Sequence, residues 1–154
     1  MTSKVYVALR IRADAARLFD AFVNDIGLWW TPSPLFATTP RAPGRLAFEG
    51  GEGGRLTETL ANGKVFEIGR ILAWAPPERL VFSWRQASFP PDLHTEVEVR
   101  FEAIGDETRV SVEHRGFTRV PEASAARHGF PDAVLQMRLA EWWRAQLEGL
   151  GRGR

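Results

Sequence analysis

The residues best suited to chemistry in this chain are a histidine, a pair of glutamates and several tryptophans. His114 has the same parity as Val110 and Val112 in an alternating run, so its imidazole is expected to point into the interior. An unperturbed imidazole titrates near neutral pH, which makes His114 a candidate general base or ligand partner. The alternative is a buried histidine whose nitrogens are bonded by a neighbouring strand or loop. No serine or cysteine in a nucleophile elbow accompanies it, which disfavours acyl transfer.

Glu58 and Glu67 flank the dipeptide Asn62-Gly63 at nearly equal distances. Asn-Gly is a strong signal for a two-residue hairpin, so the two carboxylates are expected on adjacent strands, where they would approach each other if both point inward. Such a pair would have displaced pKa values and could perform acid–base chemistry or orient a ligand. Arg70 could instead neutralise one of them, and a solvated or salt-bridged hairpin is the competing interpretation.

Aromatic side chains supply the apolar part of the candidate site. Trp30, which follows Trp29, could close a cavity mouth and donate its N–H to a bound polar group, or could simply plug the core. Trp84, Phe101 and Trp143 fall on predicted dry faces, where core packing and cavity lining use the same chemistry. The full set of candidate ligand-binding residues is Trp30, Phe48, Glu58, Phe66, Trp84, Val99, Phe101, His114 and Trp143.

Patterns that would indicate a cofactor or a metal are incomplete. The stretch Gly50 to Gly54 lacks the third glycine of a dinucleotide fingerprint, and Gly63-Lys64 is followed by valine instead of the serine or threonine of a phosphate loop. The three histidines are scattered without paired ligand spacing, and the chain has no cysteine. We therefore expect neither a cofactor nor a metal.

Length and charge limit the function further. The 154 residues predict one domain over 1–150 with a short tail over 151–154. Twenty basic and nineteen acidic residues nearly cancel, which disfavours nucleic acid and anionic membranes as partners. No apolar run has the length of a signal peptide core or a membrane span, and the absence of cysteine requires no oxidising compartment. The expected location is the cytoplasm.

The elements that must position these residues begin with a strand over 5–12, shown by its alternating apolar residues. Asp14 is a candidate cap for a helix that carries Leu18, Phe19 and Phe22, and a second short helix is expected over 25–30. The stretch 31–44 holds four prolines and has no clean period, so it is predicted to be a loop and a candidate lid.

Six antiparallel strands and one long helix are predicted to follow. The strands are expected over 46–48, 56–60, 65–74, 80–85, 95–102 and 108–115, each bounded by glycine or proline turns. From Asp132 the apolar period changes to that of a helix, and Gly149 and Gly151 are expected to end it. This order predicts an α+β fold.

An ordered set of motifs resembles the START/Bet v-like (SRPBCC) superfamily, in its Hsp90 ATPase activator homologue (AHSA-like) branch. The likeness spans nearly the whole chain, and the segments that carry it are Ile26-Gly27-Leu28-Trp29-Trp30, Gly53-Gly54-Arg55, residues 69–84, residues 107–117, and the terminal Trp143, Leu147 and Leu150. The resemblance implies a helix-grip fold, in which a curved sheet of about seven strands wraps a long C-terminal helix and encloses a ligand cavity. Trp142 stands where relatives often carry glycine, which predicts a smaller cavity here.

The favoured function is non-catalytic binding of a small hydrophobic or aromatic molecule between the sheet and the last helix. It requires that side chains leave part of that space unfilled. One alternative is a cofactor-free cyclase, dehydratase or hydrolase that uses His114 or Glu58. Another is an interaction module that stimulates a chaperone ATPase, which is disfavoured because the chaperone activators of the family carry a further N-terminal domain for which this chain has no room. A homodimer is also possible.

Overall fold

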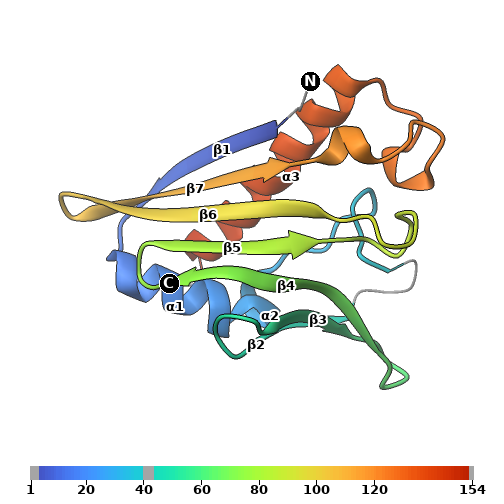
Figure 1. Cartoon of the computed structure of the whole chain (residues 1–154). Helices are drawn as coiled ribbons and strands as arrows, with labels where there is room; N and C mark the ends of the chain where they lie inside the picture. Colours follow the sequence, from blue (N-terminus) through green and yellow to red (C-terminus); the bar gives the residue numbers. More distant parts are fainter. Residues whose placement is uncertain (1–3, 40–43, 153–154) are drawn as a thin grey trace.

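A computed structural model describes residues 4–39 and 44–152, and it confirms the predicted order of strands and helices (Figure 1). The elements are β1 (Lys4–Ile11), α1 (Ala15–Asn24), α2 (Ile26–Trp29), β2 (Arg45–Glu49), β3 (Arg55–Thr59), β4 (Val65–Ala75), β5 (Arg79–Trp84), β6 (Thr95–Ile104), β7 (Glu107–Arg115) and α3 (Asp132–Arg152). Two short 3₁₀ turns that the sequence did not predict, η1 (Phe117–Arg119) and η2 (Ala125–Arg127), lie between β7 and α3.

All seven strands form one antiparallel sheet in the order β1-β7-β6-β5-β4-β3-β2. Strands β2 to β7 are a meander in which each strand pairs with the next, whereas β1 joins the far edge beside β7. The dry face of residues 97–101 and 110–114 is as predicted, because Val97, Val99, Val110 and Val112 are fully buried. The opposite face is less open than predicted, since Glu98 and Ser111 on it are buried as well.

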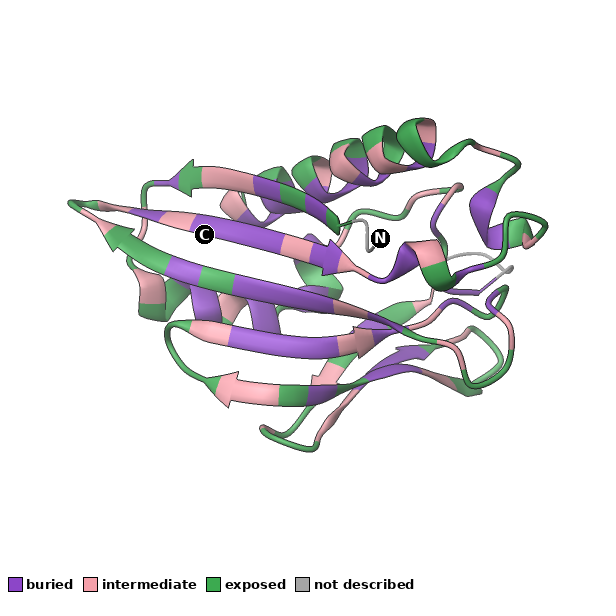
Figure 2. Cartoon of the chain, turned by 45° about the horizontal axis from the view of Figure 1, so that its top comes forward, coloured by how far each residue is buried: buried purple, intermediate pink, exposed green. Residues whose placement is uncertain are grey.

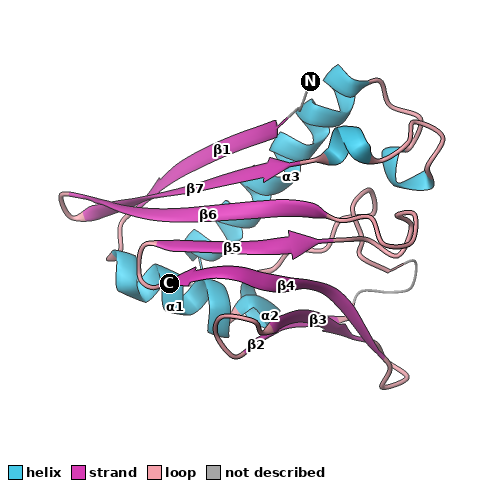
Figure 3. Ribbon diagram, in the orientation of Figure 1, coloured by secondary structure: helices cyan, strands magenta, loops and turns pink. Residues whose placement is uncertain are grey.

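The three α-helices lie on one face of the sheet, and α3 crosses it obliquely (Figure 3). The Asp14 carboxylate accepts the N–H of Arg17 at 2.8 Å and caps α1, as its position predicts. The sheet-facing side of α3 is buried and its outer side is exposed (Figure 2). No helix among residues 4–39 and 44–152 is long and apolar enough to span a bilayer. This is the α+β helix-grip arrangement that the sequence predicted.

Helix α3 does not end where its glycines predicted. It continues through Gly149 and Gly151 to Arg152. A Cβ at Gly149 would lie 2.7 Å from the backbone oxygen of Trp29, so this glycine allows α3 to approach the end of α2 closely. The missing side chain serves helix packing here, and it does not terminate the helix.

Candidate functional site

His114 lies near the end of β7 on the buried face of the sheet, and both of its ring nitrogens have partners. Its Nδ1 accepts the indole N–H of Trp143 at 3.0 Å, and its Nε2 lies 2.8 Å from Oγ1 of Thr95. An indole nitrogen can only donate, so Nδ1 carries the lone pair and the proton resides on Nε2. The Thr95 hydroxyl then accepts from Nε2 and donates to the backbone oxygen of Trp84 at 3.1 Å.

This environment holds the imidazole neutral. Burial, with a smaller contribution from the Arg115 charge, lowers the pKa of His114 to about 3. Protonation would also place a second donor against the Trp143 N–H. Because its one lone pair is occupied, His114 is a bonded core histidine in this structure, and its geometry does not suit a general base.

Aromatic rings pack around His114 and fill the space where the cavity was expected. Trp84 and Trp143 have no exposed surface, and Trp142 is 6 % exposed. The ring of Trp142 lies 5.0 Å from Trp143 and 5.5 Å from Trp84, centroid to centroid. Trp30 contacts all three indoles at 5.7 Å. Trp142 adds the bulk that the sequence predicted, so the open space lies elsewhere.

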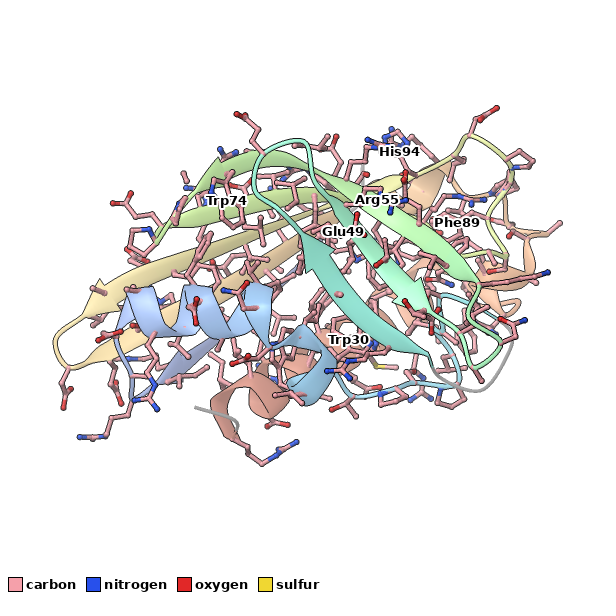
Figure 4. All side chains as sticks on the ribbon, turned by 90° about the horizontal axis from the view of Figure 1, so that it is seen from below. Trp30, Glu49, Arg55, Trp74, Phe89 and His94 are labelled. Carbon is pink, nitrogen blue, oxygen red and sulfur yellow. The ribbon has the colours of Figure 1, made fainter. Side chains whose placement is uncertain are left out.

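A pocket of about 590 Å³ lies between the start of the hairpin β2–β3 and the loop over residues 31–39, which we call the lid loop. Trp30, which follows α2 and lies beside β2 (Figure 4), lines the pocket. Most of its wall is apolar, with a few hydroxyl groups and one carboxylate. Its lining residues are Gly27, Trp30, Pro32, Ser33, Pro34, Phe36, Ala37, Thr38, Thr39, Gly44, Leu46 and Glu58.

Glu58 supplies the carboxylate of this pocket and is 4 % exposed. It faces inward because it pairs with Leu46 on β2 and shares a face with the buried Leu56. Its Oε1 accepts the hydroxyl of Thr38, and its Oε2 accepts the N–H of Gly44 at 2.8 Å. A Cβ at Gly44 would lie 2.7 Å from Cγ of Glu58, so only glycine lets the backbone come this close.

The predicted pair of Glu58 and Glu67 does not form. The hairpin closes between Leu60 and Lys64 around three residues instead of two, so Glu58 pairs with Phe66 and Glu67 pairs with Thr57. A slip of one residue moves a side chain to the other face of a strand. Glu67 therefore points outward, where Arg70 and Arg55 pair with it at 3.3 and 3.6 Å. The salt-bridged alternative describes Glu67 correctly.

The lid loop is fastened to three parts of the fold. The amide of Gln146 on α3 accepts the N–H of Thr31 at 2.8 Å and donates to its carbonyl oxygen at 2.6 Å. The carbonyl of Thr38 accepts the N–H of Ala87 at 2.7 Å, and the His128 ring bonds the carbonyl of Leu35. The described part of the loop is thus held in place, and the rest of the predicted lid, residues 40–43, lies outside the described residues.

Two of the predicted ligand-binding residues, Trp30 and Glu58, line this pocket. Val99 and Phe101 are buried in the core, with Phe101 against Phe19 at 5.3 Å. Phe48 packs on Phe82, and Phe66 lies under the Arg85 guanidinium on the hairpin. Trp29, beside Trp30, is a core residue whose N–H bonds the carbonyl of Ala21 at 2.9 Å.

Sequence reasoning missed Thr38, Thr39, Gly44, Thr95 and Gln146. Two of them had a detectable signal, because Thr95 has the inward parity of Val97 and Gln146 lies one helical turn from both Trp143 and Leu150. The lid residues had none, since their stretch shows no periodicity. Among the residues that the structure describes, no group of three or more acidic or histidine side chains could hold a metal ion.

Comparison with known proteins decides the family. A family model described as "Activator of Hsp90 ATPase homolog 1-like protein" matches residues 12–146. The chain belongs to this AHSA1 family. As the resemblance predicted, it is therefore a member of the SRPBCC superfamily. None of the curated protein sequences matches it significantly.

Solved structures similar to this AHSA1 member share its fold at low identity. Protein MLL2253 from Mesorhizobium loti has a TM-score of 0.65 at 20 % identity, covering 97 % of this chain and 95 % of that one. CalU16 from Micromonospora echinospora has a TM-score of 0.59 at 20 % identity, covering 99 % and 85 %. The Aha1 dimer from Colwellia psychrerythraea has a TM-score of 0.61 at 18 % identity, covering 97 % and 93 %.

Proposed function

We propose that this protein binds a small, largely apolar molecule in the pocket between the lid loop and the hairpin β2–β3. The observation that carries this proposal is the pocket itself. Its volume of about 590 Å³ falls in the range of roughly 300–1,000 Å³ typical of small-molecule sites. Its wall combines aromatic and aliphatic side chains with a few convergent polar groups, which is the usual composition of such sites.

The proposal keeps the predicted class of ligand but moves its position. The ligand was expected between the sheet and α3, where Trp84, Trp142 and Trp143 now pack against His114. The pocket lies next to this cluster and shares Trp30 with it. Trp30 therefore lies between the aromatic cluster and a ligand that enters beside the lid loop.

The test uses N-phenyl-1-naphthylamine, an uncharged fluorescent probe, and a variant that fills the pocket. Ala37 is exposed and lines the pocket, so the indole of Ala37→Trp would occupy the space without disturbing the core. We expect the wild-type protein to bind the probe and Ala37→Trp to bind it at least about tenfold more weakly, a loss of about 1.4 kcal/mol. The measurement is fluorescence titration, with circular dichroism to confirm folding.

The matched control is Ala133→Trp, which places the same side chain on an exposed position of α3. It should bind the probe as the wild type does. Absence of binding to the wild type, or equal binding to Ala37→Trp, would contradict the proposal.

The two alternatives have less support. Catalysis through His114 conflicts with its occupied nitrogens, so the enzyme hypothesis now depends on Glu58 alone. Recovery of every bound probe unchanged would count against it. A role with a chaperone ATPase rests on the family's description, and a homodimer rests on a neighbour described as a dimer. Both stay predictions without a geometric feature of this chain to support them.

A further inference from the structure

We infer that the pocket selects a ligand that carries a cationic, hydrogen-bond-donating group, such as a protonated amine, at its buried end. This inference rests on the proposed function and adds the class of ligand. It starts from the carboxylate of Glu58, the one acidic group among the described lining residues, which lies beside Leu46 on the inner face of the sheet. An acidic side chain is seldom buried in this way unless it makes polar interactions, because burying a carboxylate costs free energy.

The carboxylate of Glu58 is oriented and still able to accept further hydrogen bonds. The Thr38 hydroxyl and the Gly44 N–H each donate to a different oxygen. A carboxylate oxygen has two acceptor positions, so among the described residues these bonds occupy one position on each oxygen. Both donors are neutral, so they fix the direction of the carboxylate without cancelling its charge. A ligand donor approaching through the pocket would meet a preoriented anion.

A second polar group points to the same ligand. Thr39 lines the pocket, and its hydroxyl oxygen is covered by neighbouring atoms and has no hydrogen-bond partner among the residues that the structure describes. A buried polar group without a partner costs about 1–3 kcal/mol, which a ligand donor or acceptor would offset. An amine has several N–H groups, so one that bonds the Glu58 carboxylate also bonds the Thr39 hydroxyl once the Thr39 side chain turns towards the pocket.

The apolar walls suit the rest of such a molecule. Phe36 and Leu46 are buried wall residues, and the half-buried ring of Trp30 can attract a cation through its π face. An anionic ligand would meet the Glu58 charge in a poorly hydrated space, where repulsion is strong. The pocket should therefore rank ligands of one shape as cation, then neutral alcohol, then anion.

The experiment compares three probes with the same ring system, 2-naphthylethylamine, 2-naphthylethanol and 2-naphthylacetate, by calorimetric titration at pH 7. We expect the amine to bind wild-type protein at least about tenfold more tightly than the alcohol, as suits a charge-assisted hydrogen bond, and the carboxylate to bind most weakly. Glu58→Gln keeps the shape and removes the charge. It should weaken the amine at least about tenfold and change the alcohol by less than about twofold.

The control is Glu49→Gln, which removes an exposed glutamate of β2 that pairs with Arg55 near the hairpin turn (Figure 4). It should leave the amine affinity unchanged. If the alcohol binds wild type as tightly as the amine and Glu58→Gln changes neither, this inference fails while the proposed function stands. If neither the amine nor the alcohol binds, the proposed function fails. Should Glu58→Gln not fold, the charge ranking on the wild type decides alone.

Discussion

His114 is held by two hydrogen bonds whose directions are set by chemistry. The Trp143 indole can only donate to Nδ1, and the Thr95 hydroxyl completes the chain to a backbone carbonyl. A lone catalytic base would need a free lone pair facing a substrate. The interior parity of residue 114 was visible in the sequence, but these partners were not, because they come from β6 and α3. The buried position of His114 and its two bonded ring nitrogens thus support a structural role.

The buried neutral imidazole predicts a specific pH dependence of stability. The unfolded chain binds a proton at this site below about pH 6.5, whereas the folded chain does so only near pH 3. Because the unfolded state binds more protons in that window, stability falls as the pH is lowered through it. The slope contributed by this one site approaches about 1.4 kcal/mol per pH unit.

The measurement is urea unfolding of wild type and His114→Gln between pH 6.5 and pH 4.5, above the range where most carboxylates titrate. The variant should be less stable at neutral pH but should lose this slope. The control His94→Gln alters an exposed histidine and should keep the wild-type slope. An identical slope in His114→Gln would show that the imidazole is accessible to protons in the folded state.

At the scale of elements, the contact between α3 and α2 depends on one missing side chain. A Cβ at Gly149 would meet the Trp29 carbonyl at 2.7 Å, whereas a Cβ at Gly151 would meet Ile11 at an ordinary 3.5 Å. Gly149→Ala should therefore destabilise the protein by about 1–3 kcal/mol through overpacking. Gly151→Ala should be neutral or stabilising by up to about 1 kcal/mol, because alanine favours the helix.

Chemical denaturation of both variants tests these opposite expected changes in stability. Two substitutions of the same type in one helix, only two residues apart, serve as controls for each other. Stabilisation by Gly149→Ala would show that α3 can move away from α2 without loss.

Elements with a strong period could be predicted from sequence, and single-residue geometry could not. Alternation identified β6 and β7 because one face of each is dry, and the helical stripe identified α3. The dipeptide Asn62-Gly63 marked a hairpin correctly. It did not set the loop length, because a positive φ at Gly63 suits both two- and three-residue loops. The one extra residue in the loop shifts the register, so Glu58 faces the pocket while Glu67 faces solvent.

At the scale of the whole molecule, the pocket lies where the lid loop, the sheet and the helix layer meet. Gln146 links two of these parts through its paired bonds to Thr31. Gln146→Met keeps the side-chain volume and removes both bonds. We expect amide hydrogen exchange over residues 31–39 to accelerate about thirtyfold, since the two lost bonds cost about 1 kcal/mol each. The uncharged probe should also bind more weakly.

The control for this substitution is Gln136→Met, at a partly exposed position of the same helix. It should leave both hydrogen exchange in the lid loop and probe binding unchanged. Unaltered exchange in Gln146→Met would mean that the other attachments of the loop suffice.

The location of the pocket could not be predicted from the sequence either. Its walls come from a proline-rich stretch without periodicity, from β2 and β3, and from the end of α2. The predicted hollow under α3 was filled by Trp142, whose bulk the sequence did show. The sequence could indicate that the cavity shrinks there, but which neighbouring space stays open depends on side chains from these four separate segments.

The pairing of β1 with β7 has a consequence for how the chain reaches this structure during synthesis. Lys4 pairs with Arg115, so β1 lacks its partner strand until synthesis has passed residue 115. Strands β2 to β7 can pair in chain order, each with the strand before it, through the connecting turn or loop. Long-range closure of this kind slows folding. The nascent chain therefore carries β1 as an unpaired, partly apolar strand until β7 has been made, and such an exposed strand edge favours aggregation.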